Sequence, residues 1–125
     1  MANPNIINVS AIYGNSSFTA LSTTSVTSIV SNAASSGKVY KINSLMAANV
    51  DGSATVDITI NVYSNATAGS GTAYAVASTI SVPADATLVV ISKDNAIYLL
   101  ENQSIGAIAG TANDLVVTCS WEEIN

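Results

Sequence analysis

The feature that most constrains the fold is an alternation of apolar and polar residues with a period of two. It is clearest from Val56 to Tyr63, which read VDITINVY. Successive side chains of a β-strand point to opposite faces of a sheet, so this stretch predicts a strand with one apolar and one polar face. The residues expected on the buried face are Val56, Ile58, Ile60 and Val62.

The rest of the chain repeats this strand pattern and shows no sustained helical periodicity. The good helix formers Glu, Lys, Arg, Gln and Met are rare, whereas β-branched residues abound. Further strands are expected at residues 38–49, 72–82, 88–91, 97–100, 105–109 and 115–121. This pattern predicts an all-β chain, a single antiparallel β-sandwich or jelly-roll-like domain of about eight or nine short strands.

Turn residues predict how the middle strands pair. Residues 49–52 read NVDG, and Asp-Gly commonly closes a hairpin, so we expect residues 38–49 to pair antiparallel with residues 56–63. The Gly-rich loop at residues 65–71 predicts a second hairpin with residues 72–82. The inward-facing residues expected in the flanking strands are Tyr40, Ile42 and Met46, then Tyr74, Val76, Ile80 and Val82, and finally Leu115, Val117, Cys119 and Trp121.

The first 37 residues carry a weaker pattern within the single domain expected at residues 1–125. Residues 7–13 alternate, and residues 19–30 predict one or two Ser/Thr-rich strands. This segment could be extended or swapped onto another copy, because exposed strand edges pair with other chains. Its start lacks the features of a secretory signal, and we expect no stretch of about 20 apolar residues that would span a membrane.

The charge of the chain excludes several kinds of partner. The formal net charge is −5 and arginine is absent, so no basic patch is available for nucleic acid or an anionic membrane. Only 9% of the residues are charged, against about 25% in typical soluble proteins. A surface of hydroxyls, amides and alanines favours burial against other proteins. The alternative is a small domain that is secreted and acts alone.

The residues needed for common catalytic and metal sites are missing or badly placed. There is no histidine, and Cys119 is the only cysteine, so neither a Ser-His-Asp triad nor the usual zinc sites can form. Residues 49–57 carry oxygen ligands but lack the EF-hand spacing of a calcium loop. Glu122 and Glu123 should point to opposite faces of a strand, which leaves a hydrolase as the weakest hypothesis. We therefore expect no enzyme activity, no metal and no cofactor.

Three aromatic residues are the candidate contact residues. Tyr63 and Tyr98 fall on the face opposite the apolar set of their own strands, so both are expected at the surface. With Trp121 they could anchor a protein interface or stack on a sugar ring.

Several stretches together form a set of strand and turn signatures. They are residues 38–52 (KVYKINSLMAANVDG), 56–60 (VDITI), 79–91 (TISVPADATLVVI), 98–104 (YLLENQS) and 120–124 (SWEEI). These stretches resemble small virion structural proteins of tailed bacteriophages, notably those of marine phages and cyanophages. Family members often carry Pro-Ala-Gly before the lysine, where residues 34–37 here read ASSG. The resemblance covers residues 38–124, and the first third of the chain matches less well.

This resemblance implies a non-enzymatic structural protein, made in the host cytoplasm and located in the virion. Capsid decoration, or cement, is the first expectation, with a neck, tail or fibre-associated module that binds host-surface glycan as the alternative. The implied partners are copies of the chain itself, in a homo-oligomer for which a trimer is favoured, and other virion proteins such as the major capsid or neck/tail protein.

Overall fold

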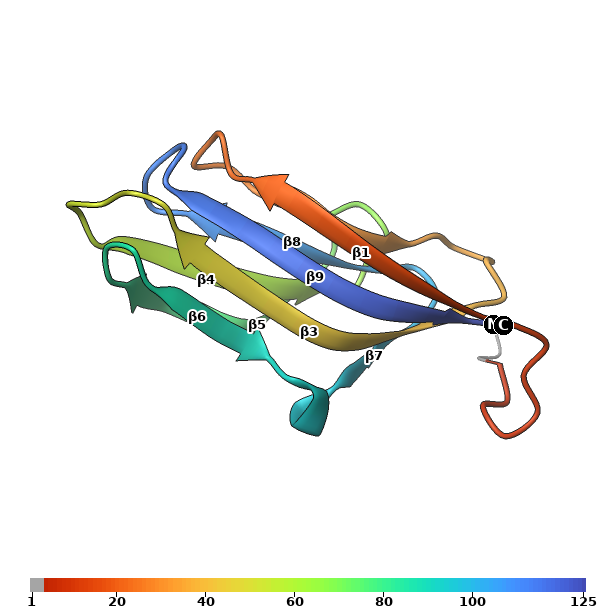
Figure 1. Ribbon diagram of the computed structural model, residues 1–125. Coiled ribbons are helices and arrows are strands. Elements are labelled where there is room, and N and C mark those ends of the chain that lie inside the picture. Colours follow the sequence, from red (N-terminus) through yellow and green to blue (C-terminus); the bar gives the residue numbers. More distant parts are fainter. Residues whose placement is uncertain (1–3) are drawn as a thin grey trace.

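The computed structural model describes residues 4–125 and folds them into two antiparallel sheets packed face to face (Figure 1). Within this range the strands are β1 (Ile12–Ala20), β2 (Thr27–Asn32), β3 (Val39–Asn49), β4 (Val56–Tyr63), β5 (Ala73–Val82), β6 (Thr87–Ile91), β7 (Ile97–Leu99), β8 (Gln103–Ala109) and β9 (Leu115–Ile124). A short 3-10 helix, η1 (Lys93–Asn95), precedes β7.

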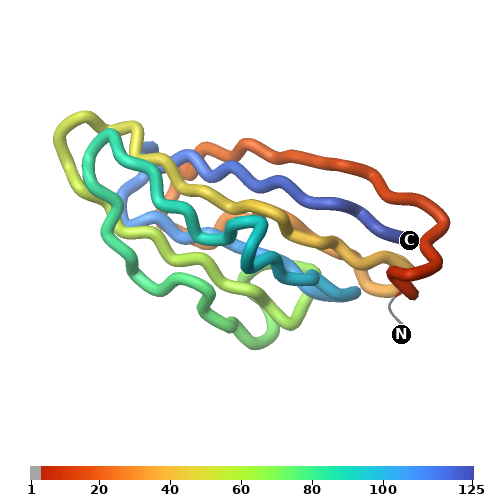
Figure 2. The backbone as a smooth tube through the Cα atoms, turned by 60° about the horizontal axis from the view of Figure 1, so that its bottom comes forward, coloured from red at the N-terminus to blue at the C-terminus, as the bar shows by residue number. Residues whose placement is uncertain are grey.

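The first sheet has the order β1-β9-β3-β6, and β7 also pairs with β3; the second sheet has the order β2-β8-β4-β5. Figure 2 shows the two layers from a second side, with β1 along one border. The predicted all-β antiparallel sandwich is thus confirmed. In residues 4–125 no helix is long and apolar enough to cross a membrane.

The core lies between the sheets and is built by the alternation seen in the sequence. The apolar face of β4 is buried as predicted, with Ile58 and Ile60 fully inaccessible to solvent and Val62 packed against the core. In β9 the predicted inward residues Leu115, Val117 and Cys119 are buried. These strands occupy interior positions of their sheets, where one face of each is covered by the opposite sheet.

The predicted hairpin between β3 and β4 is wrong. β3 pairs with β9 in the first sheet, and β4 pairs with β8 in the second. Residues 50–55 therefore cross from one sheet to the other instead of closing a two-stranded turn. Because the chain crosses here, β3 and β4 each lie inside a sheet with a neighbouring strand on both sides. Their apolar faces meet over a core about 10 Å thick.

A β-bulge in β3 reverses the predicted inward residues of its second half. The pairing shifts from Ile42–Trp121 to Ser44–Ser120, which leaves Asn43 as the extra residue. One extra residue exchanges the two faces of a strand. Leu45 is therefore fully buried, and the expectation that Met46 faces inward is wrong.

The hairpin of β4 and β5 is confirmed, but the burial predicted for β5 is not. Two register shifts leave extra residues in β5, one of them Thr79 with a φ of 49°. Tyr74, Val76 and Ile80 remain 60%, 41% and 40% exposed, and of the four predicted inward residues Val82 alone is buried. β5 has ten residues, whereas the neighbouring edge of the first sheet, β6, has five and cannot cover it.

The amino-terminal pattern is displaced from its predicted position. Residues 7–13 do not form the expected strand, and Ile7 is 94% exposed; β1 begins only at Ile12. The segment before β1 folds back on the end of β9, where the amides of Ser10 and Ala11 both donate to the carbonyl of Asn125.

Two buried asparagines link the sheets at opposite ends of β3. Asn49, the last residue of β3, donates from Nδ2 to the carbonyl of Val82 in the second sheet at 2.9 Å. Asn32, the last residue of β2, donates to the carbonyl of Leu99 in the first sheet at 3.1 Å. Each side-chain amide thus finds a backbone acceptor in the opposite sheet, so neither asparagine is buried with its amide unsatisfied, which would be costly.

Candidate interaction surfaces

Tyr63 is buried, so the expectation that it lies at the surface is wrong. It does point away from the core, as the alternation of β4 requires, but only 4% of it is exposed. The ring packs over Gly106 of β8 on the outer face of the second sheet, where Val26 and Ala68 also lie close to Gly106. Tyr63 is therefore a packing residue of the outer face.

The loop from Ser64 to Thr72 provides the cover over this part of the sheet. It is held in place by hydrogen bonds, from the Ser104 hydroxyl to the Asn65 carbonyl at 2.7 Å and from the Ala66 amide to Asn102 Oδ1 at 3.1 Å. Because the loop is anchored to β8 and its preceding turn, Ser104 to Ala107 are buried on both faces of the sheet.

Tyr98 is exposed and lies beside a shallow apolar pocket. It is 46% exposed and pairs with Lys41, while its neighbour Leu99 points into the core, so Tyr98 projects from the outer face of the first sheet. The pocket has a volume of about 240 Å³, and its lining residues are Pro4, Ile6, Val39, Tyr98 and Leu100. Apolar side chains dominate the lining, so the pocket offers few hydrogen bonds to a sugar.

Trp121 lies at the border of the core. It packs against the core cluster and stacks on Tyr40, with ring centroids 6.3 Å apart and an interplanar angle of 26°. Its indole Nε1 is buried without a hydrogen-bond partner. The three aromatic candidates therefore face three directions: Tyr63 and Tyr98 lie on the outer faces of different sheets, and Trp121 lies between the sheets.

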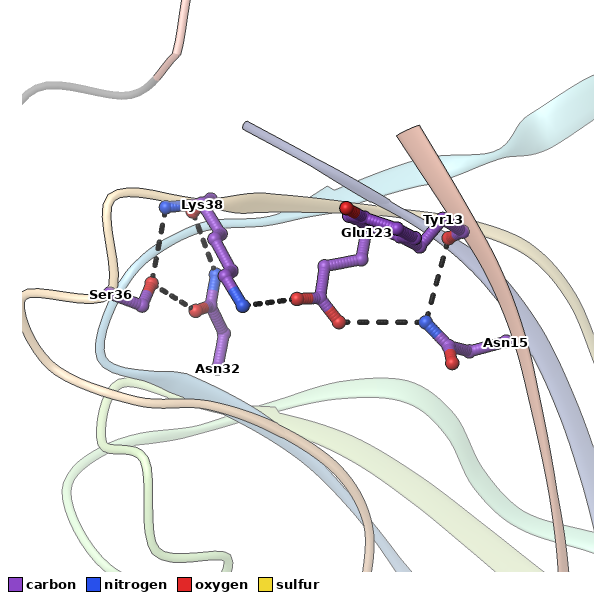
Figure 3. A network of polar contacts seen from close by, with 6 residues as sticks. All are labelled: Tyr13, Asn15, Asn32, Ser36, Lys38 and Glu123. Atoms are coloured by element: carbon purple, nitrogen blue, oxygen red, sulfur yellow. Dashed lines mark hydrogen bonds and ion pairs between the residues drawn. The ribbon is translucent and has the colours of Figure 1, made fainter. Parts of the chain in front are cut away.

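A polar network closes one end of the sandwich (Figure 3). Lys38 forms an ion pair with Glu123, whose other carboxylate oxygen accepts a hydrogen bond from Asn15 Nδ2 at 3.5 Å. The hydrogen bond and the charge of Glu123 raise the pKa of Lys38 above its ordinary value. The side chains of Lys38 and Glu123 are both partly open to solvent, so their ion pair contributes little to the free energy of unfolding.

The remaining acidic and thiol side chains considered as candidates are buried or form hydrogen bonds with neighbouring residues. Glu122 accepts a hydrogen bond from Asn43 at 2.9 Å, so the adjacent glutamates are engaged with different partners. Burial raises the pKa of the Cys119 thiol to about 12. Asp51 accepts hydrogen bonds from the amide and hydroxyl of Ser53, both at 2.9 Å, and these lower its pKa. Residues 4–125 contain no group of three His, Cys, Asp or Glu side chains that could hold a metal ion.

More than half of the exposed large apolar side chains in residues 4–125 lie on two edge strands, β1 and β5. Ile12, Tyr13 and Phe18 of β1 are 53%, 59% and 74% exposed. The exposed large apolar residues of β5 are Tyr74, Val76 and Ile80. The sequence reasoning missed β1, although a signal was present: the first charged residue of the chain is Lys38. A strand edge without charge is open to pairing with another protein.

The fold thus defines an antiparallel β-sandwich, a class that carries many unrelated functions. No model of a known protein family matches the chain, and no curated protein sequence matches it.

Proposed function

We propose that this chain is a non-enzymatic structural subunit of a tailed-phage virion, a capsid decoration protein that assembles with copies of itself and with the major capsid protein. The observation that carries the proposal is the pair of uncharged edge strands, β1 and β5, which expose aromatic and aliphatic side chains on a rigid sandwich. Exposed apolar surface of this kind favours contact with other proteins.

The low charge of the chain supports the same function. With 9% charged residues, the surface lacks the interspersed charges that keep a free monomer apart from its neighbours. The resemblance of residues 38–124 to virion proteins supplies the phage context and a preference for a three-fold ring.

The test is to purify particles of the phage that encodes the chain. Peptide mass spectrometry is expected to detect the protein in the particles, and electron microscopy is expected to place it in many copies on the capsid surface. Absence of the protein from the particles would overturn the proposal, and density at the neck or tail would replace decoration with the accessory role.

The exposed ring of Tyr98, which could stack on a sugar, favours one second candidate, a fibre-associated module that binds host glycan. Replacing Tyr98 with alanine would then abolish binding on a glycan array. Tyr74→Ala, which changes an exposed tyrosine on the other sheet, is the matched control. If neither the unchanged chain nor the control binds a glycan, this second candidate is excluded.

A further inference from the structure

β1 is a long, regular and uncharged edge of the first sheet. It pairs with β9 without a register shift over all nine residues, from Ile12 to Ala20. It contains no proline and no charged side chain. Proteins usually protect such edges with charge, bulges or short length, because the free backbone groups can pair with another chain.

The other outer strands described in residues 4–125 carry the protection that β1 lacks. β5 has two register shifts against β4, and β2 has one against β8. β6 has only five residues and also has a register shift against β3, and β7, which pairs with the same strand, has only three residues. β1 is therefore the edge on which a further strand can be added with an unbroken ladder (Figure 1).

The hydrogen bonds at the start of β1 show which backbone groups are free. Ala11 and Asn125 exchange both of their backbone hydrogen bonds, at 3.1 and 3.0 Å. In an antiparallel ladder such pairs recur at every second residue, so the intervening residues direct their N–H and C=O groups away from β9. The residues with outward backbone groups are Ile12, Gly14, Ser16, Phe18 and Ala20.

These five residues form a pattern that is complementary to itself. If a second β1 pairs antiparallel about a two-fold axis at Ser16, Phe18 lies opposite Gly14 of the other copy, and Ile12 lies opposite Ala20. All their side chains share the outer face of the sheet, where each large residue would meet a small one. An aromatic ring beside an edge glycine is a known way to stabilise strand pairing.

Gly14 gives independent support for this pairing. A glycine inside a strand weakens it and often marks a close approach by another group. A Cβ added at Gly14 would meet nothing within 4 Å, and its φ is not positive, so neither packing nor backbone conformation in the single chain requires glycine there. Phe18, 74% exposed, would fill this space from a second copy.

We infer that β1 is a two-fold contact between copies of this chain, with the strands paired about Ser16 and Phe18 packed over Gly14 of the other copy. The contact joins the first sheet of one copy to the first sheet of the other, which forms one continuous sheet. This inference rests on the proposed self-assembly and names the surface that carries it. Because a two-fold contact cannot close a three-fold ring, it replaces the trimer that the resemblance favours with a dimer.

The test compares sedimentation velocity over a dilution series for the full chain and its variants. Ser16→Lys places two like charges opposite each other and is expected to raise the dimer dissociation constant by at least about tenfold. Ser78→Lys, on the bulged edge strand β5, is the matched control and should leave dimerisation unchanged.

A second variant separates lost contact from lost folding. Gly14→Val has room in the single chain and replaces glycine with a good strand former, so the thermal midpoint of the monomer should not fall. The same change leaves no space for Phe18 of the other copy, so dimerisation should weaken by at least about tenfold. In hydrogen exchange, the outward amides of Gly14, Ser16 and Phe18 should become protected only as protein concentration rises.

Three results would overturn the β1 contact. They are a chain that stays monomeric at every concentration, oligomers that Ser16→Lys and Gly14→Val leave intact, and outward amides whose hydrogen-exchange rates do not change with protein concentration. Trimers unaffected by these variants, in a protein that purified particles contain, would refute this contact while leaving the proposed function in place. If the protein is absent from the particles but forms dimers that depend on β1, the proposed function is refuted and the β1 contact stands.

Discussion

Replacing Gly106 with alanine is expected to destabilise the fold through the outer face of the second sheet. A Cβ at this position would lie 2.8 Å from Cε2 of Tyr63, 2.8 Å from Cγ1 of Val26 and 3.2 Å from Cβ of Ala68. Carbon atoms pack without strain at about 3.5–4.0 Å, so the ring of Tyr63 and the side chain of Val26 must each retreat by roughly 1 Å.

The expected size follows from two opposing terms. Overpacking of a closely packed site costs about 1–3 kcal/mol, while exchanging glycine for alanine within a strand returns about 0.5–1 kcal/mol. The two ranges together span a net loss of about 0–2.5 kcal/mol, and their middle gives about 1 kcal/mol in the free energy of unfolding, which lowers the urea midpoint of a domain this size by about 0.5 M. Urea unfolding followed by circular dichroism measures this directly, at a concentration where the chain is monomeric.

Two further variants make this prediction specific. Gly52→Ala is the control, because its Cβ would meet Asp85 at an ordinary distance of 3.5 Å, and it should leave stability unchanged or raise it by about 0.4–1 kcal/mol. In the background of Tyr63→Leu, which removes the obstructing ring, the loss caused by Gly106→Ala should shrink by at least about 0.5 kcal/mol. If Gly106→Ala raises stability by the full amount expected for glycine to alanine in a strand, Tyr63 does not pack over β8 as described.

Three other changes have defined outcomes. Asn49→Ala removes the buried amide that donates to the carbonyls of Ala54 and Val82 and should cost about 1–3 kcal/mol in urea unfolding; a loss under 0.5 kcal/mol would contradict the link between the sheets. Cys119, buried and with its pKa raised to about 12, should resist a thiol reagent at pH 8 until denaturant is added, so prompt labelling of the folded chain would refute its burial. Glu123 raises the pKa of Lys38, so the stability advantage over Lys38→Gln should be fully present below pH 10.5 and disappear as the pH rises through the raised value; an advantage that grows with pH would contradict the ion pair.

The fold class could be predicted because alternation is a local property of each strand. In β4 and β9 the apolar face is uninterrupted, and both strands lie inside a sheet where the opposite sheet covers that face. The partners of these strands could not be predicted in the same way. Asp51-Gly52 signals a turn, but whether that turn closes a hairpin or crosses to the other sheet depends on strands far away in sequence.

Whether a predicted residue is buried depends on β-bulges and on which loops and strands cover it, and the alternation of apolar and polar residues encodes neither. The extra residue Asn43 turns Met46 out of the core. Tyr74 lies opposite Val62 but stays exposed, because the short strand β6 does not cover the edge strand β5. Tyr63 has the predicted direction but the opposite environment, because an anchored loop covers it. The exposed edge of β1 was foreshadowed by the lack of charge before Lys38, yet its regular register is visible only in three dimensions.

The position of β9 has a consequence for how the chain acquires its structure during synthesis. β9 is the last described strand in the chain, but in the first sheet it lies between β1 and β3. Until it leaves the ribosome, β1 and β3 have no common neighbour, and the apolar residues of β3 lack the strand that pairs along their whole length. The sandwich should therefore close late and in one step, with loop closure across most of the chain setting its folding rate.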